Sequence, residues 1–343
     1  MTRIYNPSVR GRCRNVLASV AGLLLWTGAS AHHSFGSFFE LDRYVEIEGR
    51  VAKIDWVNPH IKMSLETADG ETWDIEAGPV NLLTRMGIER DRIGVGDTIR
   101  ARGNPGRRDP RALWVTNILL ADDTELLTNP TAEPYWATNA VGDASAFFVA
   151  GDLALPAGAD RSLFRTWTPL ISGMPRPRED PVLTDAGRRA QAAYGIGKQV
   201  VGDCEVPGMP FAMMSPYPIE LVDRGDRILV RGEAYDLERV VHLQAPASDP
   251  EPSPLGYSLA HWENDTLVIE TGAIDYHSFG DLGPAQSDES HVTERFRLSE
   301  DGLSLDYAIT VTDPVMLAEP WAWGGSFIYR DDAEIKRWNC GAE

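Results

Sequence analysis

Apolar and polar side chains alternate in two long blocks of this chain, and this pattern limits the fold more than any other feature. The first block covers residues 38–127, and the second runs from Ile228 to Val311. Alternation with a period of two places one side chain in a core and the next in solvent, as β-strands do. The chain is therefore expected to be mainly β, with two β units.

The first block predicts a small closed barrel. Its first strand slips phase, so that Ile54 and Trp56 become the apolar pair, which indicates a β-bulge. The expected elements are strands at 45–56, 61–65 and 73–75, a helix at 81–86 ended by Gly87, and strands near 99 and at 113–120. A helix between the third and fourth of five strands is the arrangement of the OB-fold, so residues 32–127 predict an OB-like five-stranded barrel.

The second block predicts a different β domain. Residues 128–159 are rich in Pro, Ala, Gly and Asn without periodicity, so we expect a linker there. Residues 160–343 contain hairpin signals at regular spacing and one short helix at 184–194, with Thr184 as its N-cap. They predict an antiparallel β-barrel or sandwich with room for a ligand cavity.

The first 31 residues are typical of a targeting segment. Four arginines precede an apolar run from Val16 to Trp26, and Ala29-Ser30-Ala31 forms a small-residue cleavage pattern. We predict a signal peptide over residues 1–31 and a periplasmic or secreted protein, with a retained amphiphilic anchor as the alternative. The apolar run is too short for a comfortable membrane span, and no later stretch qualifies, so no transmembrane segment is expected.

The charge balance argues against nucleic acid as a partner. The chain has 51 acidic and 32 basic side chains and a formal charge of −19, which becomes −23 when the four basic groups of residues 1–31 are removed. A polyanion would lose the counterion release that drives most nucleic-acid binding. Most of the excess lies after residue 127, so this part is expected to favour neutral or cationic small molecules.

Two cysteines remain after removal of the leader, Cys204 and Cys340. In an exported protein such a pair is expected to form a structural disulfide rather than a redox or metal site. Two separate buried thiols are the alternative.

Cleavage after Ala31 would place His32 and His33 at the new N-terminus. A free α-amine, a backbone amide and imidazoles suit Cu(II), Ni(II) or Zn(II), and His60 could supply a third imidazole. We therefore predict a copper site at His32, His33 and His60. A flexible terminus and a turn histidine are the alternative interpretation.

Candidate catalytic residues lie in the second block. Along residues 291–298, Glu294 shares a strand face with apolar neighbours, whereas His291 and Arg295 share the other face. A carboxylate in apolar surroundings is either ion-paired or has a raised pKa, so Glu294 is a candidate acid or base and equally a candidate structural ion pair. Asp275 and His277 lie in a loop after a strand, where catalytic groups are often presented.

The chain resembles two uncharacterised families. The first half matches a family of small secreted bacterial proteins at Ala31-His32-His33-Ser34-Phe35, Trp56-x-Asn58-Pro59-His60, Gly96-Asp97 and Gly103-x-Pro105. The second half resembles an exported module at Cys204-x-x-Pro207-Gly208-Met209-Pro210, Trp262-Glu263-x-Asp265-Thr266-Leu267-Val268 and His291-x-x-Glu294-Arg295-Phe296. Where the second pattern has Gly-His-Ser-x-Gly, this chain has Tyr257 in place of the histidine. The resemblance implies export and two modules, and no activity.

Three functions follow from these features. The first is binding of a small ligand, together with copper. The second is a lyase, isomerase or hydrolase acting on a small neutral or aromatic substrate, with Glu294 and His291 or His277 transferring protons and Arg295 holding an anionic intermediate. The third is a module that covers another exported protein. The chain has no Gly-x-Ser-x-Gly, Walker or His-Glu-x-x-His motif, so common hydrolase, nucleotide and zinc-protease mechanisms lack their signatures.

Overall fold

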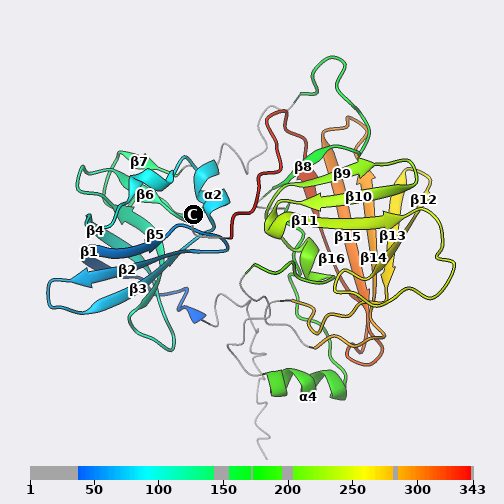
Figure 1. Ribbon diagram of the computed structural model, residues 1–343, viewed down its shortest axis with the longest axis horizontal. Helices are drawn as coiled ribbons and strands as arrows, with labels where there is room; N and C mark the ends of the chain where they lie inside the picture. Colours follow the sequence, from blue (N-terminus) through cyan, green and yellow to red (C-terminus); the bar gives the residue numbers. More distant parts are fainter. Residues whose placement is uncertain (1–37, 143–153, 171–172, 195–203, 281–284, 341–343) are drawn as a thin grey trace, which may run out of the picture. The chain divides into compact units, whose positions relative to one another are not determined.

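The structure is a computed structural model that describes residues 38–142, 154–170, 173–194, 204–280 and 285–340. Strands dominate the described residues and form two closed barrels, which confirms the predicted fold class (Figure 1). The predicted leader and its two histidines lie outside these residues. In the part of the chain that is described, no helix has the length and apolar character needed to cross a membrane.

The N-terminal barrel has five strands and one helix between the third and the fourth. Its elements are β1 (Val45–Asp55), β2 (Ile61–Thr67), β3 (Thr72–Ala77), α2 (Val80–Arg85), the 3-10 helix η1 (Arg90–Arg92), β4 (Thr98–Pro105) and β5 (Ala112–Leu119). The strands pair in the order β3-β2-β1-β4-β5, and β3 pairs with β5 in parallel to close the barrel. This is the predicted OB-like topology.

Local sequence accounts for these elements. The predicted bulge lies in β1, where the register with β2 shifts between Val51 and Lys53. Gly87 follows α2 with a φ of +77°, a value that ends a helix and that L side chains rarely adopt. The buried alternate residues Ile61, Met63 and Leu65 of β2 face the barrel core.

The first domain extends beyond the boundary expected from the sequence. Strands β6 (Glu125–Leu127) and β7 (Ala140–Val141) continue the sheet after β5, so residues 128–142 belong to this domain and are not a linker. Glu125 explains the difference, because its buried carboxylate accepts backbone N–H bonds from Tyr135, Trp136 and Ala137. Amino-acid composition, on which the linker prediction rested, does not indicate this contact.

The C-terminal barrel has nine strands. They pair in the closed order β10-β11-β12-β13-β14-β15-β16-β8-β9, antiparallel except for β11 with β12. Their bounds are β8 (Thr166–Pro169), β9 (Ile219–Asp223), β10 (Arg227–Gly232), β11 (Leu237–His242), β12 (Tyr257–Glu263), β13 (Thr266–Gly272), β14 (His291–Leu298), β15 (Ser304–Thr312) and β16 (Trp321–Ile328). Among its described residues the helices are α4 (Asp185–Tyr194), η3 (Phe211–Met213) and η4 (Ala234–Asp236).

Two predicted details of this domain are confirmed. The Thr184 hydroxyl accepts the N–H of Gly187 at 3.0 Å and so caps α4. Cys204 and Cys340 form the expected disulfide across 136 residues of sequence. The segment before Cys340 is held further by Glu233, which accepts the Lys336 N–H at 2.9 Å.

The interior of the second barrel is packed with large side chains. Trp167, Phe296 and Phe327 are almost fully buried in its core. The interior also contains the Arg239 and Glu294 side chains, which are 1% and 0% exposed. Arg239 lies on β11 and Glu294 on β14, and the outer face of β14 contributes to a pocket.

Candidate functional site

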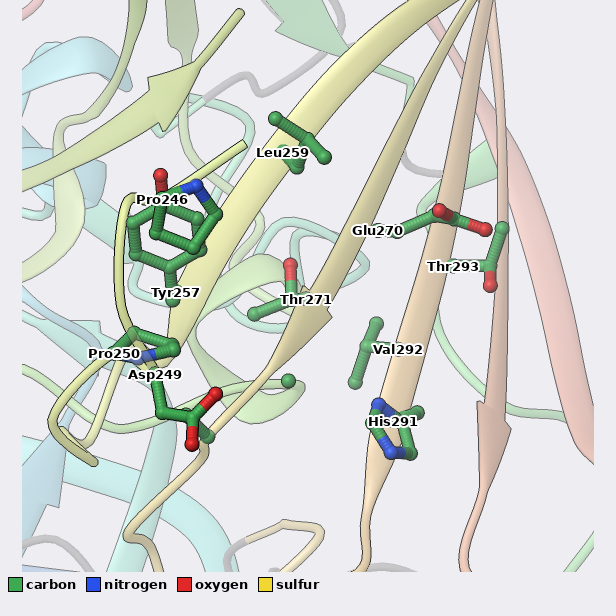
Figure 2. Close-up of a pocket in the computed structure, with 12 residues that line it drawn as sticks. Pro246, Asp249, Pro250, Tyr257, Leu259, Glu270, Thr271, His291, Val292 and Thr293 are labelled. Atoms are coloured by element: carbon green, nitrogen blue, oxygen red, sulfur yellow. The ribbon is translucent and has the colours of Figure 1, made fainter. Parts of the chain in front are cut away.

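The main candidate site is a pocket of about 610 Å³ on the outer face of β12, β13 and β14. This volume lies in the range of small-molecule sites. Figure 2 shows the residues of the 246–250 loop and Tyr257 on one side of the pocket, and Glu270, Thr293 and His291 on the other. The pocket is lined by Pro246, Asp249, Pro250, Tyr257, Leu259, Glu270, Thr271, Gly272, Ala273, His291, Val292 and Thr293.

Strand register explains why these residues meet. Leu259 of β12 lies opposite Glu270 of β13, and Glu270 lies opposite Thr293 of β14. Since side chains alternate along a strand, these three side chains share the outer face. The side chains of their chain neighbours Ser258 and Thr271 are buried. The outer face is thus a three-strand floor for the pocket.

Tyr257 is held rigidly at one wall of the pocket. Its ring stacks on the His242 ring with a centroid distance of 4.4 Å and an interplanar angle of 7°. Its hydroxyl donates to the Gln244 carbonyl at 3.3 Å. The ring therefore has a fixed orientation and offers one flat apolar surface, as in preorganised ligand sites.

His291 owes its position to a glycine. A Cβ atom placed on Gly272 would lie 2.9 Å from His291 Nδ1, which is too close for either group to stay in place. Gly272 lacks that atom, so the imidazole can lie against β13 beside the pocket. Among the predicted catalytic residues, His291 is the one that lines this pocket.

The pocket combines apolar walls with negative charge. Two prolines, Leu259 and the Tyr257 ring provide apolar surface, and Asp249 and Glu270 supply carboxylates. His291 and Thr293 add groups that can donate hydrogen bonds. Such a lining suits a neutral or cationic molecule with an apolar or aromatic body, because an anion would be repelled by both carboxylates.

Glu294 lies elsewhere, inside the barrel. Its carboxylate forms a buried ion pair with Arg239 and accepts the Tyr307 hydroxyl at 2.9 Å. Arg239 also donates to Ser258 at 3.0 Å and Thr271 at 3.1 Å, so the cluster is extensively hydrogen-bonded. Burial and the Glu294 charge raise the pKa of Tyr307 well above 10, which keeps this hydroxyl a donor. These contacts match the structural ion pair that the sequence left as one alternative.

Arg295 lies on the outer surface and does not join Glu294. It donates to Glu263 at 2.7 Å, and this hydrogen bond raises the pKa of Arg295 and lowers the pKa of Glu263. Asp275 and His277 are exposed in the loop after β13, and neither lines the pocket. The structure thus separates the acid–base set of Glu294, His291 and Arg295 that the sequence suggested.

Several pocket residues were not identified from the sequence. Tyr257, Leu259 and Glu270 lie on β12 and β13, and their alternation indicated only a strand face. The useful signal was Tyr257 at the position where the resembling family has a histidine. Asp249 and the two prolines of the 246–250 loop could not be assigned to the pocket from the sequence. Their position over the sheet depends on the path of the loop in the folded structure.

His60 is the one predicted metal ligand within the described residues. Its ring packs edge-on against Trp114 at 5.1 Å, and its Nδ1 lies 3.9 Å from Glu76. Burial, helped by the charge of Lys62, lowers the pKa of His60 to about 4, while burial raises the pKa of Glu76. Among the described side chains no group of three potential ligands could hold a metal, and this does not test the copper prediction, because His32 and His33 lie outside them.

The comparisons with known proteins reach the N-terminal module only. A model described as a family of unknown function (DUF6152) matches residues 20–113. This match supports an uncharacterised family for the N-terminal module, as the resemblance implied. No curated protein is similar enough to this chain to count as a match. The resemblance of the second module to an exported family stays a prediction.

Proposed function

We propose that this is an exported binding protein that holds a small neutral or cationic molecule with an aromatic or apolar body in the pocket of β12–β14. The observation that carries the proposal is the pocket of about 610 Å³. The fixed Tyr257 ring lines one side of it, and Glu270 and His291 line the other. A flat ring recognises the body of the ligand, and the carboxylates select against negative charge.

Binding has more support than catalysis. The enzyme hypothesis paired His291 with Glu294, and Glu294 is committed to Arg239 inside the barrel. Arg295, the proposed anion holder, is paired with Glu263 on the surface. Without these two partners, His291 is better assigned as a hydrogen-bonding group of a binding pocket.

Three phenols of similar size test the charge preference. Calorimetric titration with tyramine, 4-ethylphenol and 4-hydroxyphenylacetate compares a cation, a neutral molecule and an anion on one ring. We expect tyramine and 4-ethylphenol to bind and 4-hydroxyphenylacetate to bind about tenfold more weakly or not at all. The Glu270→Gln variant should reduce the difference, whereas Arg297→Ala, on the neighbouring strand β14 and outside the pocket, should not. Equal affinity for all three phenols would contradict the proposal.

Export is part of the proposal and has its own support. The leader pattern of residues 1–31 and the Cys204–Cys340 disulfide both fit an oxidising compartment outside the cytosol. Intact mass of protein purified from its native cell should show loss of residues 1–31 and of two thiol hydrogens. Full-length, thiol-reduced protein would contradict export.

Copper binding by His32, His33 and His60 is a second candidate function. Phe39 and His60 both pack against the Trp114 ring, with centroid distances of 5.9 and 5.1 Å. His33 lies six positions before Phe39 in the sequence, and six extended residues span about 20 Å, which allows the N-terminal histidines to reach His60. Titration of processed protein with Cu(II) should give tight binding that both His33→Ala and His60→Ala weaken. Binding that neither substitution affects would contradict this site.

A further inference from the structure

A second pocket, of about 520 Å³, lies on the N-terminal domain and has a different chemistry. It involves β4, β5, the segment before β1 and the loop after β6. It is lined by Leu41, Tyr44, Arg102, Asn104, Thr116, Asn117, Asn129, Thr131, Ala132, Glu133, Pro134 and Tyr135. Amide and hydroxyl side chains make up much of this lining.

Arg102 is clamped between two tyrosine rings. Its guanidinium carbon lies 3.9 Å from the centroid of Tyr44 and 4.3 Å from the centroid of Tyr135. Stacking fixes the plane of the guanidinium, and its N–H groups lie in that plane at the edge of the stack. The two rings are 49% and 53% exposed, so each still presents apolar surface to solvent.

The amides of this pocket are held in place by their own hydrogen bonds. Asn104 Nδ2 donates to backbone carbonyls, the shortest bond being 2.8 Å to Arg43. Asn117 Nδ2 donates to Glu125 at 2.7 Å and to the Glu133 carbonyl at 2.9 Å. These contacts orient the polar groups before any ligand arrives, which lowers the entropy cost of binding.

Glu125 also positions the loop that carries Tyr135. Its carboxylate is buried and accepts the N–H groups of Tyr135, Trp136 and Ala137 at 2.8 to 2.9 Å. Burial alone would raise the pKa of Glu125, but these backbone hydrogen bonds and the one from Asn117 lower it overall. The charged carboxylate therefore anchors one wall of the pocket.

The charge around Arg102 is balanced by acidic neighbours. Glu46 of β1 lies opposite Arg102 in the strand register, and Glu133 lines the pocket. An inorganic anion would meet these carboxylates as well as the guanidinium. A purely apolar ligand would instead take the Arg102 guanidinium out of water without giving it hydrogen-bond acceptors, at a cost in free energy.

We propose that this pocket binds a neutral saccharide. A sugar ring offers C–H faces that pack on tyrosine rings, and its hydroxyl groups both donate and accept hydrogen bonds. Tyr44 and Tyr135 supply the faces, and Arg102 with Asn104 and its neighbours supplies fixed polar groups. The site is independent of the phenol-sized pocket on the second barrel, so either proposal can fail alone.

Calorimetric titration of the mature, disulfide-bonded protein tests this proposal. The probes are chitotriose and maltotriose as neutral trisaccharides, and inorganic phosphate and acetate as anions. We expect at least one trisaccharide to bind and neither anion to compete with it. Tyr135→Ala should weaken trisaccharide binding about tenfold, while Tyr135→Phe, which keeps the ring, should bind about as well as the parent protein.

Two further variants separate the role of the pocket from a general loss of folding. Arg102→Lys keeps the charge but loses the planar stacked group, and should weaken the trisaccharide severalfold with an unchanged unfolding midpoint. Tyr257→Ala, in the other pocket, should leave trisaccharide binding unchanged. The proposal is overturned if neither trisaccharide binds at 10 mM, if phosphate or acetate displaces the sugar, or if Tyr135→Ala binds as the parent protein does.

Discussion

Each of the two β domains fully buries a glutamate, Glu125 in the first and Glu294 in the second, and the two are satisfied in different ways. Glu125 of β6 accepts hydrogen bonds from three consecutive backbone N–H groups that lie 10 to 12 residues away in sequence. Glu294 of β14 has instead a charged partner, Arg239, which lies 55 residues away on β11. The first arrangement shapes a loop, whereas the second joins distant strands through the barrel interior.

The difference shows what each carboxylate contributes. The partners of Glu125 are neutral backbone N–H groups, so replacing Glu125 leaves no unpaired buried charge. Only the hydrogen bonds that position the loop are lost. Replacement of Glu294 leaves Arg239 charged and buried, which is far more costly.

The largest effect is expected from Glu294→Ala. It should lower the free energy of unfolding by about 3–5 kcal/mol, because the Arg239 charge loses its partner in the barrel interior. Urea denaturation followed by near-UV circular dichroism measures this. The double variant Glu294→Met with Arg239→Met should recover most of the loss. A single variant as stable as the parent protein would show that Arg239 finds another partner.

Glu125→Gln should have a smaller effect on stability. The amide keeps one acceptor oxygen but turns an NH₂ group toward backbone N–H donors, so we expect a loss of about 1–3 kcal/mol. Trisaccharide binding should weaken with it, because the loop that carries Tyr135 loses its anchor. If stability falls while sugar affinity is retained, Glu125 does not position the pocket.

The free energy of unfolding at acidic pH should also depend on Glu125. The pKa of Glu125 is lowered in the folded state, so its stabilising contribution is present above the unfolded pKa of about 4.3 and is lost as pH falls through the lowered value. Unfolding free energies measured between pH 2 and 6 should therefore rise less steeply with pH in Glu125→Gln than in the parent protein. Parallel curves for the two proteins would contradict the lowered pKa.

The smallest change in stability is expected at the outer face of the second barrel. Gly272→Ala introduces a methyl group against His291 and should displace the imidazole at a cost below about 1 kcal/mol. Binding of tyramine should weaken severalfold by calorimetry, although His291 is still present. Arg295→Ala serves as the control, since its pair with Glu263 is solvent-exposed, contributes little to stability and lies outside the pocket. Unchanged tyramine affinity in Gly272→Ala would show that His291 does not take part in binding.

Much of the fold could be predicted from local patterns. Alternation identified the strands of the first barrel, and the helix between its third and fourth strands predicted the OB-like topology. The phase slip before Ile54 correctly indicated the bulge. The continuation of the sheet to β7 was not predicted, because residues 135–137 are held by a single buried carboxylate, which has no compositional signature.

Less of the candidate site could be predicted from the sequence. Alternation along β14 predicted that Glu294 and Arg295 face opposite ways, but it did not assign Glu294 a partner. Arg239 lies on a strand far along the chain, and only barrel closure brings the two side chains together. The pocket around His291 likewise requires the 246–250 loop and a parallel pairing of β11 with β12.

The sequence by itself determined the strands, the barrel type of the first module and the cap of α4, because each follows from short-range periodicity or from residue chemistry. It made the Cys204–Cys340 disulfide the expected state without excluding two separate thiols. Only the tertiary structure decided that Glu294 is an internal ion-pair partner, that Glu125 anchors a loop, and that Tyr257 and His291 line one pocket. These relations join side chains across a closed sheet, and the energy of such contacts depends on which distant strands become neighbours.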